Sequence, residues 1–171
     1  MIAFRLLITE EEIKKKINEM AERLRKDYEG ERVHIVMILK GAIFFVSDLM
    51  RALPGSMCTL DAIQCKSYGL LGTQKGDLSL MGLDSIEVVD KHVLIVDDIY
   101  DTGTTMQAVL ERIKSMGPKS VKTLVLLSKR LSGRPPCDYA LFEIGKGFVV
   151  GYGLDHNERY RGFKDIHIIV E

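Results

Sequence analysis

The chain has 171 residues, of which 46% are hydrophobic, and its 24 Lys and Arg side chains balance 24 Asp and Glu. This length and composition fit one globular core, so we expect a single domain spanning residues 1–171. The balanced charge provides no bulk attraction to nucleic acid or to a membrane surface, and we expect neither as a partner.

Three cysteines, Cys58, Cys65 and Cys137, show no metal-binding spacing and no C-x-x-C motif. Free thiols in a reducing compartment are the ordinary interpretation of such a pattern. The apolar stretch at the N-terminus is too short for a signal peptide or a membrane span. We therefore expect a cytoplasmic protein.

The first predicted elements are a helix, a buried strand and a second helix. Thr9 and Glu12 have the spacing of a capping box, and apolar residues then recur at helical intervals to about Tyr28. The continuous apolar run 34–39 is typical of a strand buried on both faces. A second helix is expected over about 42–53, where a Pro-Gly pair follows it.

Lys40 and Gly41 stand where the first buried strand turns into the second helix. By themselves they are as typical of an ordinary turn with a solvated charge as of a binding site.

A long hairpin is predicted after the second helix. Residues 60–66 form a strand candidate, and Ser67 and Tyr68 begin a glycine-punctuated segment that regains apolar alternation at about 78–81. The tip of this hairpin is either a surface loop without function or a lid over a site.

The central stretch, from Val93 to Met106, combines two kinds of binding chemistry. Four apolar residues predict a buried strand, which ends in the acids Asp97 and Asp98. The turn that follows leads into an amphipathic helix, and the backbone N–H groups at such a helix start can surround an anion. The residues of this turn are Asp101, Thr102, Gly103, Thr104 and Thr105.

Because carboxylates repel phosphate, the two halves of this stretch fit a ligand with two chemically different ends. A sugar phosphate satisfies both, with its phosphate in the turn and its hydroxyls, or Mg²⁺ bound to them, near the carboxylates. Receiver domains also bind Mg²⁺ through an acid pair, but there the pair lies near the chain start, whereas Asp97 lies past the middle of this chain. No G-x-x-x-x-G-K-[ST] loop follows a predicted strand, which excludes a Walker-type nucleotide site.

The remainder of the chain predicts further strands. A helix ending near Met116 and a strand over 121–127 complete a parallel β-α-β unit. Lys129 then lies at the same sheet edge as the acid pair, although a solvated Lys-Arg pair is an equally ordinary interpretation. Short strands are expected over 138–144 and 148–153. The predicted fold class is α/β, with a central, mostly parallel sheet flanked by helices.

The stretch from Val93 to Met106 resembles the phosphoribosyl pyrophosphate (PRPP) motif of the type I phosphoribosyltransferases. Residues 38–45 resemble the pyrophosphate loop of the hypoxanthine-guanine branch of that family, including an unusual peptide geometry ahead of the lysine. Residues 148–155 resemble its purine-binding hood. The resemblance implies a core of about 30–145, a small hood from the N-terminal segment and about 146–171, and a flexible β-hairpin loop.

The resemblance also implies roles on the PRPP side of the site. Asp101 would be the catalytic base for the purine. The pyrophosphate would be bound by Lys40, Gly41 and Arg161, with Arg159 as the competing choice by spacing. The residues that would bind the ribose and its phosphate are Asp97, Asp98, Thr102, Gly103, Thr104 and Thr105.

On the purine side, the resemblance gives Lys129 the carbonyl oxygen at position 6 of the base. Phe148 would stack on the ring, and the backbone of Val149 would contact its edge. Ser67 and Tyr68 would belong to the flexible loop that closes over the reacting centre.

The implied metal is Mg²⁺, held by Asp97 and Asp98, with a second ion on Asp155. His156 departs from the family pattern, in which a tyrosine is frequent at this place, and an imidazole there could alter base preference or pH response.

The implied activity is purine salvage, by Mg²⁺-dependent transfer of 5-phosphoribosyl from PRPP to hypoxanthine, and also guanine, giving IMP or GMP and pyrophosphate. A xanthine-preferring enzyme is one alternative. A PRPP-fold, RNA-binding transcription regulator is another, but it would need a basic face. Relatives form dimers and tetramers, so we expect a homodimer or homotetramer, with the helix that carries Phe44 and Phe45 as a candidate contact.

Overall fold

The computed structural model describes residues 2–67, 78–129 and 137–170 of the chain. Its α-helices are α1 (Glu10–Asp27), α2 (Ile43–Ala52) and α3 (Thr104–Lys114), and a short 3-10 turn, η1, covers Leu83–Ser85. Its strands are β1 (Ala3–Ile8), β2 (Val33–Leu39), β3 (Cys58–Ser67), β4 (Leu78–Met81), β5 (His92–Tyr100), β6 (Ser120–Lys129), β7 (Tyr139–Ile144), β8 (Val149–Val150) and β9 (Ile166–Val170).

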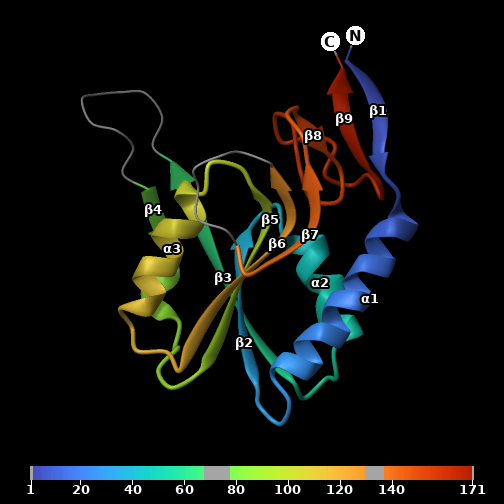
Figure 1. Cartoon of the computed structure of the whole chain (residues 1–171). Coiled ribbons are helices and arrows are strands. Elements are labelled where there is room, and N and C mark those ends of the chain that lie inside the picture. The colour runs from blue at the N-terminus through green and yellow to red at the C-terminus, as the bar shows by residue number, and fades with distance from the viewer. Residues whose placement is uncertain (1, 68–77, 130–136, 171) are drawn as a thin grey trace, which may run out of the picture.

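Six of the strands form the main sheet, in the order β4-β3-β2-β5-β6-β7. All neighbours in it are parallel except β3 and β4, which pair antiparallel as the predicted hairpin requires. Helices α1 and α2 cover one face and α3 covers the other (Figure 1). The predicted α/β class, with a mostly parallel sheet flanked by helices, is therefore confirmed.

The two faces of the sheet bury alternate residues of the same strands. In β5, Leu94 and Val96 join the core beneath α1 and α2, whereas Val93 and Ile95 join the core beneath α3. This alternation explains why a parallel strand covered on both faces reads as an unbroken apolar run. It also leaves the carboxyl end of β5 as the first place where a polar side chain can reach solvent.

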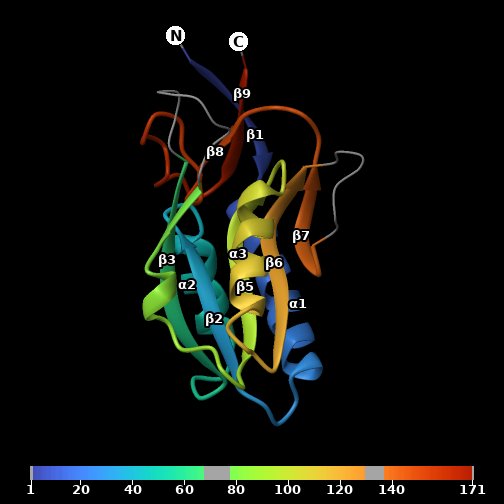
Figure 2. The same cartoon turned by 90° about the vertical axis from the view of Figure 1, so that its left-hand side faces the viewer.

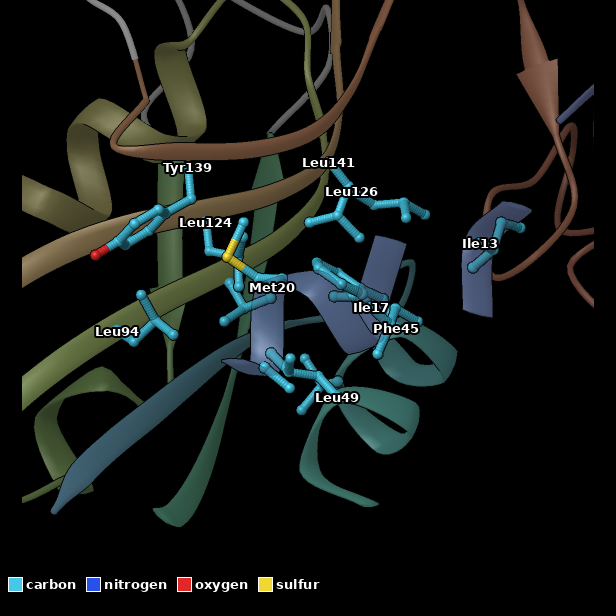
Figure 3. Close-up of a cluster of buried hydrophobic side chains, with 14 of the residues drawn as sticks. Ile13, Ile17, Met20, Phe45, Leu49, Leu94, Leu124, Leu126, Tyr139 and Leu141 are labelled. Carbon is cyan, nitrogen blue, oxygen red and sulfur yellow. The ribbon is translucent and has the colours of Figure 1, made fainter. Parts of the chain in front are cut away.

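Helix α1 begins at the predicted place. Thr9 accepts a hydrogen bond from the Glu12 backbone N–H, and the Glu12 carboxylate accepts one from the Thr9 backbone N–H, at 2.8 Å, which completes the capping box. Figure 3 shows the apolar side of α1 directed toward α2 and the strands, with Ile17 and Met20 among the labelled side chains.

In α2, Phe45 is fully buried, whereas 41% of the Phe44 side chain is exposed. Of the two expected contact residues, only Phe44 can therefore meet a partner surface.

Strands β1, β9 and β8 form a separate small sheet, in which β9 pairs antiparallel with both neighbours. Figure 2 shows this sheet beyond the end of the main sheet, with both termini beside it. We call the hood the small sheet together with the loop of residues 151–165. Neither β1 nor β9 is among the predicted elements.

The predicted strand over 148–153 is shorter than expected, since β8 ends at Val150. Gly151, Tyr152 and Gly153 all have positive φ, at 101°, 49° and 101°, which no β-strand accommodates. In contrast, β5 continues to Tyr100, beyond the acids at which the predicted strand ends, so that Asp97 and Asp98 lie within the strand. In the described part of the chain, none of the helices is both long and apolar enough to cross a bilayer.

Candidate active site

The turn after β5 presents backbone donors at the start of α3. Gly103 is the residue before the helix and has φ of 85°, a left-handed conformation that favours glycine. A Cβ there would also lie 2.7 Å from the Tyr100 hydroxyl oxygen, so no side chain fits. The Thr102 and Thr104 hydroxyls are 3.1 Å apart. The Thr104 N–H donates to the Thr102 hydroxyl at 3.4 Å. The N–H groups of a first helical turn, the helix dipole and these hydroxyls can attract an anion, which is the role that the sequence predicts for this turn.

The acid pair lies immediately before this turn, half-buried at the end of β5. Burial raises the pKa of Asp97 well above its usual range, and the negative charge of Asp98 raises it further. Burial also raises the pKa of Asp98, although hydrogen bonds and the Arg161 guanidinium oppose the shift. A cation or sugar hydroxyls at this place would therefore stabilise the ionised pair.

The loop after β2 packs directly against the acid pair. The Leu39–Lys40 peptide bond is cis, which is the unusual geometry that the family resemblance implies. A Cβ on Gly41 would lie 1.7 Å from Asp98 Oδ2, so only glycine allows this approach. Gly153 of the hood packs on the other side, where a Cβ would lie 2.0 Å from the Gly41 carbonyl oxygen. The hood, the β2 loop and the acid pair are thus in direct contact.

Lys129 and Asp101 form an ion pair across the sheet edge. Tyr100 of β5 is in register with Ser128 of β6, so the next residues along both chains become neighbours. Lys129 Nζ lies 2.8 Å from Asp101 Oδ2, and the lysine side chain is 17% exposed while that of the acid is 49% exposed. The pair presents a hydrogen-bond donor and an acceptor side by side near the start of α3.

A network of ion pairs connects the hood to the β2 loop. Arg161 donates from NH1 to the Gly153 carbonyl at 2.7 Å and lies 2.7 Å from Asp155 Oδ1 through NH2. The same NH2 lies 3.3 Å from Glu158 Oε2, and that oxygen also accepts from Lys40 Nζ at 3.0 Å. The hydrogen bonds from Lys40 and then Arg161 lower the pKa of Glu158. Lys40 and Arg161, both predicted pyrophosphate ligands, are therefore brought together.

Arg159, the competing choice, is exposed, and its described hydrogen bonds are backbone bonds with His156. The geometry thus favours Arg161 over Arg159 as the arginine of this site.

Two of the predicted purine residues, Phe148 and Val149, lie beside and in β8. Phe148 is 54% exposed, and its ring centroid lies 5.3 Å from that of His156, edge to face. The Phe148 carbonyl accepts from Ile169 N–H of β9, so Val149 occupies the alternate position of the ladder. Its own peptide groups therefore point away from β9, toward the outer edge of this sheet, where a base edge could be contacted.

The metal ligands that the resemblance implies are not one cluster. No group of three or more His, Cys, Asp and Glu side chains among the described residues could hold a metal ion. Asp97 and Asp98 together supply carboxylate oxygens, the donors that Mg²⁺ prefers, and burial, which raises the pKa of both, makes their ionised forms costly without a further cation. These two residues fit Mg²⁺ whose remaining ligands are substrate oxygens and water. Asp155 is instead engaged by Arg161.

Two predicted residues lie at or beyond the limit of what is described. Ser67 is the last residue of β3, and Tyr68 lies outside the described residues.

Three features of the site are absent from the sequence-based prediction. Glu158 bridges two cations, Gly153 allows the hood to touch the β2 loop, and the Tyr152 hydroxyl donates a short hydrogen bond to Asp48 of α2. The glycines on either side of Tyr152 indicate a turn, but the contacts with Lys40, Gly41 and Asp48 join residues more than a hundred positions apart. No local spacing could have identified them.

Comparison with known proteins places this geometry in a family. The family model described as phosphoribosyl transferase domain matches residues 7–157. The hypoxanthine-guanine phosphoribosyltransferase of Dictyostelium discoideum is 35% identical over 161 residues, which cover 91% of this chain and 89% of that protein. The hypoxanthine-guanine-xanthine phosphoribosyltransferase of Tritrichomonas foetus is 33% identical over 171 residues, or 98% of this chain and 92% of that protein.

Among solved structures, hypoxanthine phosphoribosyltransferase from Trypanosoma cruzi in complex with the product IMP is similar with a TM-score of 0.86. Its sequence is 35% identical, and the match covers 96% of this chain and 93% of that one. Sequence and fold agree, and this chain belongs to the phosphoribosyltransferase family, in the branch of the hypoxanthine-guanine enzymes.

Proposed function

We propose that this chain transfers the 5-phosphoribosyl group of PRPP to hypoxanthine and guanine, releasing pyrophosphate and IMP or GMP. The observation that carries the proposal is the Lys129–Asp101 pair, with 2.8 Å between Nζ and Oδ2, beside the start of α3. The 6-oxygen and the N7–H of a 6-oxopurine are an acceptor and a donor on the same edge of the base. A lysine and a carboxylate side by side are complementary to that edge. Adenine offers an amino donor where Lys129 requires an acceptor.

PRPP would lie along the sheet edge, with its two ends in the two halves of the central motif. Its 5-phosphate would accept hydrogen bonds from the N–H groups and hydroxyls of residues 102–105 at the start of α3. Its ribose hydroxyls would face Asp97 and Asp98. Its pyrophosphate would be bound by Lys40, Gly41 and Arg161, because a lysine and an arginine there are held within reach of a single oxygen atom.

Asp97 and Asp98 would also hold Mg²⁺, with Asp155 as the candidate for a second ion. Bound Mg²⁺ would neutralise charge on the pyrophosphate and on the carboxylates. An ionised acid pair beside the ribose would in addition favour positive charge that develops on the sugar.

In the reaction, the bond from the anomeric carbon to pyrophosphate breaks, and its electron pair leaves on the pyrophosphate. A ring nitrogen of the purine forms the new bond to that carbon. Asp101 accepts the proton from N7, so that the base does not retain a positive charge. Lys129 donates to the 6-oxygen and orients the ring, and Phe148 provides a face on which it stacks.

Which purine bases the site accepts depends on the contacts to the edge of the base. The backbone of Val149, directed to the outer edge of β8, would contact the base edge that differs among hypoxanthine, guanine and xanthine. The Tritrichomonas foetus relative carries xanthine in its name, so xanthine is a specific competitor to test.

The test incubates the protein with PRPP, Mg²⁺ and each of hypoxanthine, guanine, xanthine and adenine, and measures pyrophosphate and nucleotide formed. We expect turnover with hypoxanthine and guanine that EDTA abolishes, and none with adenine. Preference for xanthine would support the alternative specificity. RNA binding in a filter assay without purine consumption would instead favour a regulator and contradict the enzymatic proposal.

We further propose a homodimer or homotetramer that uses the start of α2. Ile43 and Phe44 are 42% and 41% exposed there, and Phe163 of the hood is 38% exposed. Phe44 and Phe163 also line a cavity of about 130 Å³ between α1, α2 and the hood. Sedimentation of wild type and Phe44→Ser should show a smaller assembly for the variant. Cys58 and Cys65 are free thiols, which fits a reducing compartment such as the cytoplasm.

A further inference from the structure

Glu158 has no part in the transfer described above, yet its carboxylate lies between two residues that do. Oε2 of Glu158 is 3.0 Å from Lys40 Nζ and 3.3 Å from Arg161 NH2. One carboxylate oxygen thus bridges both cations, as an oxygen of a bound pyrophosphate would. The inference rests on the proposed function, which assigns Lys40 and Arg161 to the pyrophosphate of PRPP.

We propose that Glu158 is a resident anion that occupies the pyrophosphate site of the free protein and is displaced when PRPP binds. Glu158 then competes with the substrate for Lys40 and Arg161. After the reaction the carboxylate returns to the same cations and favours release of the product pyrophosphate.

The backbone around Glu158 holds it in place. Asn157, Glu158 and Tyr160 have φ of 53°, 60° and 73°, the left-handed region that side chains rarely adopt. Two sets of hydrogen bonds maintain this conformation. The Glu158 N–H donates to Asp155 Oδ2 at 2.8 Å, and the backbones of His156 and Arg159 bond each other in both directions at 3.1 Å. The loop therefore fixes the direction in which the Glu158 side chain leaves the backbone.

The Glu158 carboxylate is held weakly enough for another anion to displace it. The Glu158 side chain is 65% exposed and that of Lys40 is 53% exposed, so solvent screens their attraction. Pyrophosphate carries several negative charges and could replace one carboxylate at both cations. An anion with less negative charge than pyrophosphate would gain less by doing so, and Glu158 would in this way select against anions such as inorganic phosphate.

A different role for Glu158 makes the opposite prediction. If the carboxylate served to hold Lys40 in the orientation that PRPP needs, its removal would weaken substrate binding. If it competes with substrate, its removal must strengthen binding. The sign of the change therefore decides between the two roles.

The deciding variant is Glu158→Gln, which keeps the shape of the side chain and removes its charge. We expect KM for PRPP and the calorimetric Kd for pyrophosphate to fall about two- to tenfold, the range for one or two exposed ion pairs. We also expect inorganic phosphate to inhibit the variant more strongly. Glu29→Gln, at an exposed position after α1, is the matched control for the loss of one negative charge and should change neither constant. Unchanged or raised constants in Glu158→Gln would overturn the proposal.

A second variant separates this proposal from the one on which it rests. Lys40→Met should weaken pyrophosphate binding. If it does not, the assignment of the pyrophosphate site is wrong, and the role of Glu158 is wrong with it. If Lys40→Met weakens binding while Glu158→Gln fails to strengthen it, the pyrophosphate site stands and only the competing role of Glu158 is rejected. Thermal unfolding of each variant verifies that it is folded.

Discussion

The acid pair at the end of β5 and the ion-pair network of the hood are in contact through two glycines, yet they handle charge in opposite ways. Asp97 and Asp98 are two like charges in a partly buried place, and burial raises the pKa of both. In the network between the hood and the β2 loop, Arg161 pairs with Asp155 and Glu158, Lys40 pairs with Glu158, and the pKa of Glu158 is lowered. In the first region burial and like charge oppose ionisation, and in the second region the cations are already paired with carboxylates.

This difference indicates how one site can bind a ligand with two chemically different ends. A metal ion or hydroxyl groups would stabilise the ionised acid pair, because they would offset the repulsion between its two carboxylates. The network between the hood and the β2 loop would instead open for an anion that replaces its carboxylates, as we propose for Glu158. A phosphorylated, Mg²⁺-binding sugar such as PRPP provides both.

The largest expected effect lies next to the acid pair, at Asp101. Asp101→Asn keeps the size of the side chain but removes the carboxylate that we propose accepts the purine proton. We expect kcat to fall by about 10²-fold or more, with KM for PRPP little changed, because phosphate and pyrophosphate contacts remain. Steady-state kinetics with hypoxanthine measure both constants. Near-normal turnover would exclude Asp101 as the base.

The next effect tests the cations of the hood by comparing two arginines. Arg161→Gln removes charge-assisted hydrogen bonds, so KM for PRPP should rise about ten- to a hundredfold. Arg159→Gln serves as the control, since its side chain is exposed, and should change KM less than about threefold. Equal changes in KM for PRPP in the two variants would contradict the assignment of Arg161, rather than Arg159, to the pyrophosphate.

The contact between the two regions can be broken at Gly153. A Cβ there would lie 2.0 Å from the Gly41 carbonyl, and the φ of 101° adds strain for any other residue. We expect Gly153→Ala to lower the free energy of unfolding by about 1–3 kcal/mol and to raise KM for PRPP, as the hood moves from the β2 loop. Urea denaturation and kinetics measure these effects. Gly145→Ala, where a Cβ meets no atom within 4 Å, is the control. A Gly153→Ala variant as stable and as active as wild type would show that the close packing of Gly153 on Gly41 contributes to neither property.

The smallest expected effect concerns how much the acid pair lowers the free energy of unfolding in the unliganded protein. Because the pKa of Asp97 is raised on folding, the folded protein binds a proton more tightly than the unfolded chain. The contribution of Asp97 to the free energy of unfolding is therefore fully present below its ordinary pKa of 3.8, and it is lost as the pH rises through the raised pKa. Asp97→Asn removes this charge, so at pH 7.5 it should be more stable than wild type by about 1–2 kcal/mol.

Urea denaturation without Mg²⁺ or PRPP, at pH 4 and pH 7.5, measures this difference. It should shrink at the lower pH. A variant that is less stable than wild type at pH 7.5 would show that the acid pair does not carry the expected repulsion.

The two regions also differ in how far the sequence predicts them. The acid pair, the turn of residues 101–105 and Lys129 follow from local patterns, because a buried strand must end in solvent and parallel strands share one edge. The register of β5 and β6 then brings Asp101 and Lys129 together. The main sheet and its helices are predictable for the same reason.

The hood depends on contacts that no local pattern contains. β8 has only two residues, and β1 and β9 gain their structure by pairing with each other from opposite ends of the chain. Glu158 meets Lys40 across 118 positions. The left-handed residues 157, 158 and 160 are not glycines, so the sequence carries no sign of that turn.

The account is tested most directly by calorimetric titration of PRPP, with and without Mg²⁺, into wild type and the double variant Asp97→Asn/Asp98→Asn. If one ligand joins the two halves of the motif, wild type should bind PRPP tightly only with Mg²⁺. The double variant should lose at least about tenfold in affinity and most of the dependence on Mg²⁺. Equal affinity of the double variant and wild type for PRPP in the presence of Mg²⁺ would contradict the account.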